Sequence, residues 1–253
     1  MSHLVLEGVT KRFGGLVAVN NVGFVVDPNS VCSVIGPNGA GKTTLFNLIT
    51  GVSRPDRGKI TLHDVSLIGN YPEHIAQQGI SRTFQNIRLF KHLSAIENVL
   101  VGTVFKSAPS FLQQLVIPFG KYALIPELLQ KATSWLEWVG YKADYNKLPQ
   151  ELSYGDQRRI EIARALATEP NLLILDEPTA GMVAQEAHQV IELIHKLRSA
   201  GMTIMLIEHN MNVVSSVSDK VVVLNFGQKL AEGSPEEIKK NPEVISAYLG
   251  AEQ

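Results

Sequence analysis

The chain has 253 residues, 45% of them hydrophobic and 19% charged, and its 23 basic and 24 acidic residues leave a formal net charge of −1. A chain of this length can bury a self-supporting core, and a single cysteine excludes a disulfide framework within it. The balanced charge gives no global basic field, which argues against a nucleic-acid binder. With no signal pattern and no apolar run near ~20 residues, we expect a protein made and kept in the cytosol.

The first part of the chain is predicted to be rich in β-structure. Within residues 3–35, the segments LVLEGV, VGFVVD and VCSVIG predict short strands separated by turn-prone residues. Cys32 lies in the last of these strands, and we expect its thiol to be buried rather than reactive. From Lys42 the segment KTTLFNLIT has helical spacing and stops at Gly51. This region therefore predicts a strand, a glycine-rich loop and a helix.

The middle of the chain, about residues 88–165, is predicted to be helical. Residues 128–139 place Leu128, Ala132, Trp135, Leu136 and Val139 on one face of a helix closed by Gly140. The apolar stretch at 111–125 is interrupted by proline, glycine and lysine, so it cannot span a bilayer but could contact a membrane or a partner. We interpret the whole region as a helical insert in an α/β core.

Two later apolar runs predict buried parallel strands. LLILD at 172–176 and TIMLIE at 203–208 are continuously apolar and end in acidic residues, and residues 184–200 between them have helical spacing. Strand, helix and strand in this order predict a parallel sheet. Near the end, KVVVLNFGQKLAEG predicts a hairpin turning at Phe226–Gly227, followed by short helices opened by Ser234–Pro235, with Glu237 as a capping-box partner, and by Asn241–Pro242.

The strongest motif is a glycine-rich loop between the third predicted strand and its helix, matching G-x-x-x-x-G-K-[ST]. Its glycines let backbone N–H groups surround the β-phosphate of a nucleotide. Lys42 is expected to reach the β- and γ-oxygens, and Thr43 to bind Mg²⁺. The expected nucleotide-binding residues here are Gly36, Pro37, Asn38, Gly39, Ala40, Gly41, Lys42, Thr43 and Thr44. The motif predicts a P-loop nucleotide site without fixing its class.

The run LLILDEP is expected to supply the other half of the site. Asp176 comes at the carboxyl end of a predicted buried strand, where α/β sheets present ligands, and should hold Mg²⁺ through water. Glu177 then faces the γ-phosphate, where a carboxylate can orient or deprotonate the attacking water. The alternative is an acidic pair that merely caps a helix after the strand.

Together these motifs resemble those of the ABC ATPase family, and the resemblance covers nearly the whole chain. LSYGDQ at 152–157 is similar to the family's LSGGQ signature and lies shortly before the acidic strand. The resemblance implies that Ser153 and Gly155, with Tyr154 and Asp156 in the same loop, bind the γ-phosphate of ATP held by the opposite subunit. The alternative is that Ser153 and Asp156 form a capping box, and both interpretations can hold at once.

Three single residues also match the family pattern. Gln85, in RTFQN, matches the glutamine that contacts Mg²⁺ or water, and His209, in IEHN, matches the switch histidine. Phe13, in KRFGG, matches the aromatic residue that stacks on adenine, although it could be an ordinary half-exposed strand aromatic. The resemblance thus implies that Lys42, Gln85, Glu177 and His209 are catalytic residues, that Thr43, Gln85 and Asp176 are metal-binding residues, and that ATP and Mg²⁺ are the cofactors.

The sequence departs from the family pattern at three positions. Tyr154 replaces the first signature glycine and Asp156 its glutamine, while Val183 stands where the loop after Glu177 usually has Asp. The first two changes leave Ser153 and Gly155 in place. The third removes a polar contact expected across the dimer and leaves open a regulatory subunit without turnover.

The resemblance implies a P-loop ABC ATPase fold with a mixed, largely parallel sheet, an antiparallel β-subdomain and a helical insert. We expect one cassette over residues 1–253, with a core at about 1–87 and 166–253 and the insert at about 88–165. RTFQNIRLFKHLSAIENVLVG and the ending GSPEEIKKNPEVISAYLG look most like ATPases of branched-chain amino-acid importers.

The implied partners are a second ABC ATPase subunit, which could be a copy or a paralogue, integral membrane permeases and an external substrate-binding protein. The implied location is the cytoplasmic face of the membrane, and the apolar part of the insert with the Gln85 loop would accept a permease helix. Urea or amide import, lipopolysaccharide export and a soluble non-transport ABC ATPase remain alternatives.

Overall fold

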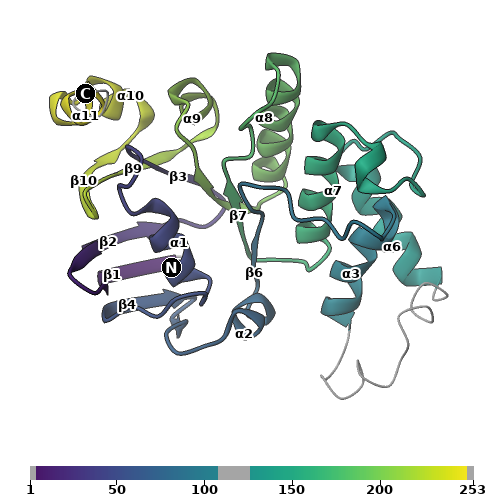
Figure 1. Cartoon of the computed structure of the whole chain (residues 1–253), viewed down its shortest axis with the longest axis horizontal. Coiled ribbons are helices and arrows are strands. Elements are labelled where there is room, and N and C mark those ends of the chain that lie inside the picture. Colours follow the sequence, from purple (N-terminus) through teal and green to yellow (C-terminus); the bar gives the residue numbers. More distant parts are fainter. Residues whose placement is uncertain (1–3, 108–125, 250–253) are drawn as a thin grey trace.

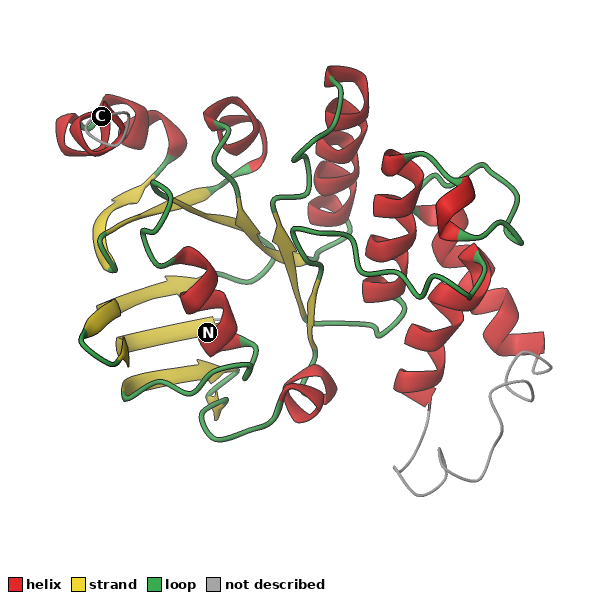
Figure 2. Cartoon of the chain, in the orientation of Figure 1, coloured by secondary structure: helices red, strands yellow, loops and turns green. Residues whose placement is uncertain are grey.

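The computed structural model describes residues 4–107 and 126–249, which form two β-sheets with helices around them (Figures 1 and 2). The apolar stretch at 111–125 lies outside the described residues. The strands are β1 (Leu4–Phe13), β2 (Leu16–Val26), β3 (Val31–Ile35), β4 (Arg57–Leu62), β5 (Val65–Ser66), β6 (Ile80–Arg82), β7 (Leu172–Asp176), β8 (Thr203–Ile207), β9 (Lys220–Asn225) and β10 (Gln228–Gly233). The helices are α1 (Lys42–Ile49), α2 (Pro72–Gln77), α3 (Ala95–Ser107), α6 (Pro126–Trp138), the short 3₁₀ helix η1 (Pro149–Glu151), α7 (Tyr154–Leu166), α8 (Ala184–Ser199), α9 (Met211–Val217), α10 (Pro235–Lys240) and α11 (Pro242–Leu249).

The larger sheet has the strand order β10-β9-β3-β8-β7-β6 and is parallel except for β10, which pairs with β9 in antiparallel fashion. Every residue of β3, β7 and β8 is buried, which explains their continuous apolar sequences. The smaller sheet has the order β2-β1-β4-β5 and is antiparallel. The mixed parallel sheet and the antiparallel β-subdomain are therefore confirmed.

Apolar side chains fill both faces of the larger sheet. Because residues alternate along a strand, Cys32 and Val34 of β3 pack toward the smaller sheet and α1, whereas Val31 packs toward the helical side. Figure 2 shows α1 between the two sheets. Cys32 is fully buried, as expected, and burial raises the pKa of its thiol to about 12.

The described residues of the central region are mainly helical, as predicted: α3, α6 and α7 pack together beside β6 and β7 (Figure 1). On α6 the predicted face, with Leu128, Ala132 and Leu136, is buried against the other helices. No helix among residues 4–107 and 126–249 is long and apolar enough to cross a membrane.

The carboxyl-terminal elements also follow the sequence prediction. The hairpin between β9 and β10 turns at Phe226–Gly227, and Ser234 and Glu237 form the predicted capping box at the start of α10. Asn241 accepts backbone hydrogen bonds at the start of α11. These helices pack against β9 and cover one end of the larger sheet.

Candidate active site

The glycine-rich loop connects the buried strand β3 to α1 and has a backbone that requires glycine. Gly36 and Gly41 have positive φ angles of 150° and 98°. A Cβ atom on Gly36 would lie 2.1 Å from the carbonyl oxygen of Leu224, and one on Gly41 would lie 2.3 Å from that of Ala18. The loop is therefore pressed against β9 and β2 and has little freedom to change shape.

Lys42 lies at the first turn of α1, with its side chain directed back into the loop. Its Nζ donates hydrogen bonds to the carbonyl oxygens of Gly36 at 2.7 Å and Pro37 at 3.0 Å. Burial lowers the pKa of Lys42, while the carboxylates of Glu177 and Asp176 act in the opposite direction. The lysine is thus a partly desolvated cation at a helix amino terminus, an arrangement suited to an anion.

One cavity of about 460 Å³ brings together most of the predicted nucleotide and catalytic residues. Its lining consists of Phe13, Leu16, Val17, Ala18, Asn38, Gly39, Ala40, Gly41, Lys42, Thr43, Thr44, Gln85, Glu177, Phe226 and Gly227. Phe13, at the end of β1, is 51% exposed, and Lys11 Nζ lies over its ring at 5.4 Å from the centroid, so the ring is only partly accessible for stacking. An aromatic surface at one side and a phosphate-binding loop at the other match the two ends of a nucleotide.

Two side chains from separate loops, those of Gln85 and His209, lie beside Glu177. Gln85 Nε2 donates a 2.8 Å hydrogen bond to Glu177 Oε2, and Nδ1 of His209 lies 3.8 Å from Glu177 Oε1. Glu177 has a positive φ of 45°, which is uncommon for a residue other than glycine and is associated with functional sites. The geometry leaves this carboxylate at the mouth of the cavity with an amide and an imidazole beside it.

Asp176 comes at the end of β7, as predicted, but its main partner was not predicted from the sequence. Arg82 NH2 donates to Asp176 Oδ2 at 2.7 Å, and both side chains are less than 10% exposed. Asp176 does not line the cavity itself, although it directly precedes Glu177. The only signal for Arg82 in the sequence was a charged residue in a short buried segment, which requires a partner.

The predicted metal-binding residues fit Mg²⁺ by the chemistry of their donors. Thr43, Gln85 and Asp176 offer hydroxyl, amide and carboxylate oxygens, which Mg²⁺ prefers, and Asp176 Oδ1 accepts no hydrogen bond from any described residue. Within the described ranges, no cluster of three or more His, Cys, Asp or Glu residues could hold a metal by itself. Mg²⁺ commonly uses one or two carboxylates together with substrate phosphates, so this donor set suits a nucleotide-bound metal.

The signature residues begin α7 and lie apart from the cavity. Ser153 is the N-cap: its Oγ accepts a hydrogen bond from the backbone of Asp156 at 3.1 Å and donates one to Asp156 Oδ2 at 3.0 Å. Ser153 is therefore confirmed as the helix cap, but the capping box is only half formed, because the Asp156 carboxylate accepts from the Ser153 hydroxyl rather than from its backbone N–H. A role of these residues in binding phosphate stays a prediction. None of Ser153, Tyr154, Gly155 and Asp156 lines the cavity that contains Lys42.

Arg158, which the sequence did not single out, joins α7 to the Gln85 loop. Its guanidinium donates to the carbonyl oxygens of Phe84 at 2.8 Å and Gln85 at 3.0 Å, and to Glu161 Oε2 at 2.7 Å. Glu161 Oε1 in turn accepts hydrogen bonds from the backbone of Phe84 and Arg88. Burial raises the pKa of Glu161, and the charge of Arg158 partly offsets this effect.

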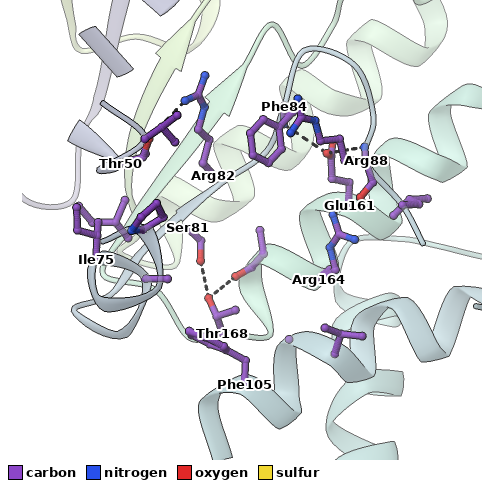
Figure 3. Close-up of a pocket in the computed structure, with 18 of the residues that line it drawn as sticks. Thr50, Ile75, Ser81, Arg82, Phe84, Arg88, Phe105, Glu161, Arg164 and Thr168 are labelled. Atoms are coloured by element: carbon purple, nitrogen blue, oxygen red, sulfur yellow. Dashed lines mark hydrogen bonds between the residues drawn. The ribbon is translucent and has the colours of Figure 1, made fainter. Parts of the chain in front are cut away.

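A second cavity, of about 590 Å³, lies between α2 and β6 on one side and α3 and α7 on the other. Figure 3 shows Phe84, Arg88 and Glu161 grouped on one side of this cavity. Ile75 and Phe105 lie on two other sides of it, apart from that group and from each other. The lining is mainly apolar, with Arg82, Arg88 and Arg164 adding positive charge. The sequence predicted a groove beside the Gln85 loop. This cavity lies beside that loop, since Phe84, which directly precedes Gln85, lines it.

Comparisons with known proteins agree with this geometry. The family model described as "ABC transporter" matches residues 19–180, and the one described as "Branched-chain amino acid ATP-binding cassette transporter" matches residues 228–253. The branched-chain amino acid transport ATP-binding protein LivG of Escherichia coli K12 is 45% identical, with 98% of this chain and 97% of LivG covered. The corresponding protein BraF of Pseudomonas aeruginosa is 47% identical, with 99% of each chain covered.

Solved structures give the same result. The ADP conformation of MJ1267, an ATP-binding cassette of an ABC transporter, has a TM-score of 0.87 and 32% identity, and 99% of each chain is covered. The dimeric cassette MJ0796 bound to ADP and Pi has a TM-score of 0.77 and 26% identity, with 92% of this chain and 98% of that one covered. The chain is therefore similar to ATP-binding cassettes both in sequence and in fold.

Proposed function

Because the chain belongs to the ABC transporter family of ATP-binding proteins, we propose that it hydrolyses ATP to power the import of branched-chain amino acids. The observation that carries this proposal is the convergence of Gln85 and His209 on Glu177 at the mouth of the P-loop cavity. A nucleotide with adenine on Phe13 and phosphates in the loop would present its γ-phosphate to this group.

The proposed reaction is in-line attack of water on the γ-phosphorus, which forms a new P–O bond, breaks the bond to the β,γ-bridging oxygen and releases ADP and inorganic phosphate. Glu177 accepts a proton from the attacking water, a role worth ~10²–10⁴ in rate, and Gln85 fixes the orientation of its carboxylate. His209 contributes its imidazole beside Glu177 Oε1, where it can hold the water or the phosphate. Thr43, Gln85 and Asp176 would hold Mg²⁺, which supplies charge neutralisation at the β- and γ-oxygens.

A second ATPase subunit completes each site in this proposal. The first observation in support is that the signature residues of α7 do not line this chain's own cavity, so a phosphate held by Lys42 lacks Ser153 and Gly155. The second is that the related cassette MJ0796 was solved as a dimer. A copy of this chain or a paralogue would bring its signature loop to the bound ATP. The ATP would then be bound between the two subunits and would hold them together.

The groove between α2 and α3 is the proposed contact with the permease. It is concave, mainly apolar and flanked by Phe84, next to the catalytic Gln85. A cytoplasmic helix of the permease lying there would contact α2 and β6 of the core and also α3 and α7 of the helical region. Closure of the ATPase dimer would then move that permease helix. In this proposal the chain lies at the cytoplasmic face of the membrane, and an external substrate-binding protein acts on the other side.

The transported substrate is inferred from the relatives. LivG and BraF are branched-chain amino acid transport proteins, and residues 228–253 match the family named for that transport. This similarity favours amino-acid import over urea or amide import and over lipopolysaccharide export. Uptake of labelled leucine in a cell that lacks the gene, restored by the unaltered chain, is the test of this substrate, and restored urea uptake instead would contradict it.

The ATPase proposal is tested with Glu177→Gln in the purified chain. Phosphate release should fall by ~10²–10⁴ while nucleotide binding is retained, because the amide keeps the shape of the carboxylate but cannot accept the proton. Glu192→Gln is the matched control, since Glu192 is exposed on α8 and its only ionic partner among the described residues is His188. Full activity in Glu177→Gln would remove Glu177 from the mechanism, and no turnover in the unaltered chain with its partners would indicate a silent regulatory subunit.

A further inference from the structure

Arg82 is a buried cation that connects three elements of the nucleotide site. It is the last residue of β6, and its NH2 donates to Asp176 Oδ2 at the end of β7. Its NH1 donates at 2.8 Å to Oδ1 of Asn47, on the helix α1 that begins with Lys42. Figure 3 shows the Arg82 side chain directed toward Thr50, the residue that caps the carboxyl end of α1. Arg82 NH1 lies 3.5 Å from the Thr50 hydroxyl.

This arrangement ties together two of the residues proposed to bind Mg²⁺. Asp176 is held directly, and Asn47 lies one turn after Thr43 on α1, toward the carboxyl end of that helix, so a single planar guanidinium links the end of β7 to α1. Arg82 occupies only Asp176 Oδ2 and leaves Oδ1 without a partner among the described residues. The carboxylate is thus fixed in rotation but keeps a free oxygen.

We propose that Arg82 is a positioning residue for the magnesium–nucleotide site: it fixes Asp176 relative to α1, the helix that carries Thr43, in the placement that the bound metal requires. The proposal rests on the function proposed above. Removal of a residue that hydrogen-bonds to a metal-binding side chain typically weakens metal affinity about 10- to 100-fold. The effect should therefore appear in the contribution of Mg²⁺ to nucleotide binding and not in metal-free binding.

Two other roles for Arg82 predict different results. If it only neutralises a buried carboxylate, any cation at position 82 would serve, and Arg82→Lys would behave as the unaltered chain does. If it competes with the metal for Asp176, its removal would raise the affinity for Mg²⁺. Positioning requires the fork of the guanidinium, because a lysine ammonium is a single point of charge that cannot hold Asp176 and Asn47 in the same geometry.

The experiment measures the Kd of a non-hydrolysable ATP analogue in excess Mg²⁺ and in EDTA, and takes the ratio of the Kd in EDTA to the Kd in excess Mg²⁺, which is the gain in affinity from the metal. Arg82→Lys is the deciding variant because it retains the buried charge, and Arg82→Gln is the stronger perturbation. We expect the ratio to fall about 10-fold in the lysine variant and toward about 100-fold in the glutamine variant, with the Kd in EDTA within about two-fold of the unaltered value. Arg198→Gln removes another arginine–aspartate pair, on the surface and away from the cavity, and should leave the ratio unchanged.

An unchanged or increased ratio in Arg82→Lys would overturn the proposal. Thermal unfolding of each variant checks that it is folded, and if Arg82→Gln does not fold, the lysine variant decides alone. Failure of the proposed function has a separate signature: the unaltered chain itself would then show no gain in nucleotide affinity from Mg²⁺.

Discussion

Replacing Arg158 by methionine should strongly destabilise the chain. The Arg158 and Glu161 side chains are 0% and 1% exposed and lie 2.7 Å apart. Removal of one member of such a buried pair leaves an uncompensated charge and costs about 3–5 kcal/mol. At roughly 2–4 °C per kcal/mol for a chain of this size, Arg158→Met should lower Tm by roughly 6–20 °C. Circular dichroism during heating and urea unfolding provide the measurement.

The second change Glu161→Gln should recover more than half of that loss. Glu161 Oε1 accepts both backbone hydrogen bonds, from Phe84 and Arg88, and a glutamine oxygen can keep them. Of the two Glu161 oxygens, only Oε2 loses its partner in Arg158→Met, and the amide removes the charge at that atom. The carbonyl oxygens of Phe84 and Gln85 also lose a donor, and Glu161→Gln does not recover that part of the loss. The double variant therefore separates the cost of an unpaired charge from the cost of lost packing.

The same pair predicts a dependence on pH with a definite sign. Burial raises the pKa of Glu161 above its ordinary value of 4.5, and loss of Arg158 raises it further. A carboxyl group with a raised pKa in the folded state stabilises the fold fully below the unfolded pKa, and that contribution is lost as the pH rises through the folded pKa. The stability gap between Arg158→Met and the unaltered chain should narrow when the pH is lowered from 7 toward 5. A loss below about 1 kcal/mol, or a gap that widens at low pH, would refute the reasoning.

Two further substitutions test local features. Val183 is the N-cap of α8, is 66% exposed and makes no side-chain cap hydrogen bond, so Val183→Asp should stabilise the chain by about 1 kcal/mol in urea unfolding, whereas Val183→Ala should bring no such gain. Gly36→Ala would place a Cβ 2.1 Å from the Leu224 carbonyl oxygen, so nucleotide binding measured by calorimetry should be lost. Gly15→Ala, with no atom within 4 Å, is its control, and retained binding in Gly36→Ala would show that the loop is more adaptable than its geometry indicates.

Much of the fold was predictable because its signals are local. The apolar runs of β7 and β8 carry no alternation, which occurs when a strand is covered on both faces, and both strands are completely buried. The P-loop was recognisable because its backbone accepts only glycine at positions such as Gly36 and Gly41. The placement of Glu177 followed from its position immediately after a buried strand.

The contacts that organise the site were not predictable in the same way. Arg82 and Asp176 are 94 residues apart in the sequence, and Arg158 and the Gln85 carbonyl are 73 residues apart. No periodicity or spacing rule links residues at such separations, because their pairing depends on how β6, β7 and α7 pack. The sequence showed charged residues in apolar surroundings, and the fold supplied their partners.

The burial of Cys32 has a practical consequence for spectroscopy. This residue is the only cysteine of the chain, it is the second residue of the buried strand β3, and its raised pKa keeps it as a protonated thiol at neutral pH. A maleimide or a spin label therefore has no native target in the folded protein. Cysteines introduced on α7 and beside the P-loop would be the only labelled positions, so the approach of one subunit to another could be followed by distance measurements in a chain that keeps its natural core.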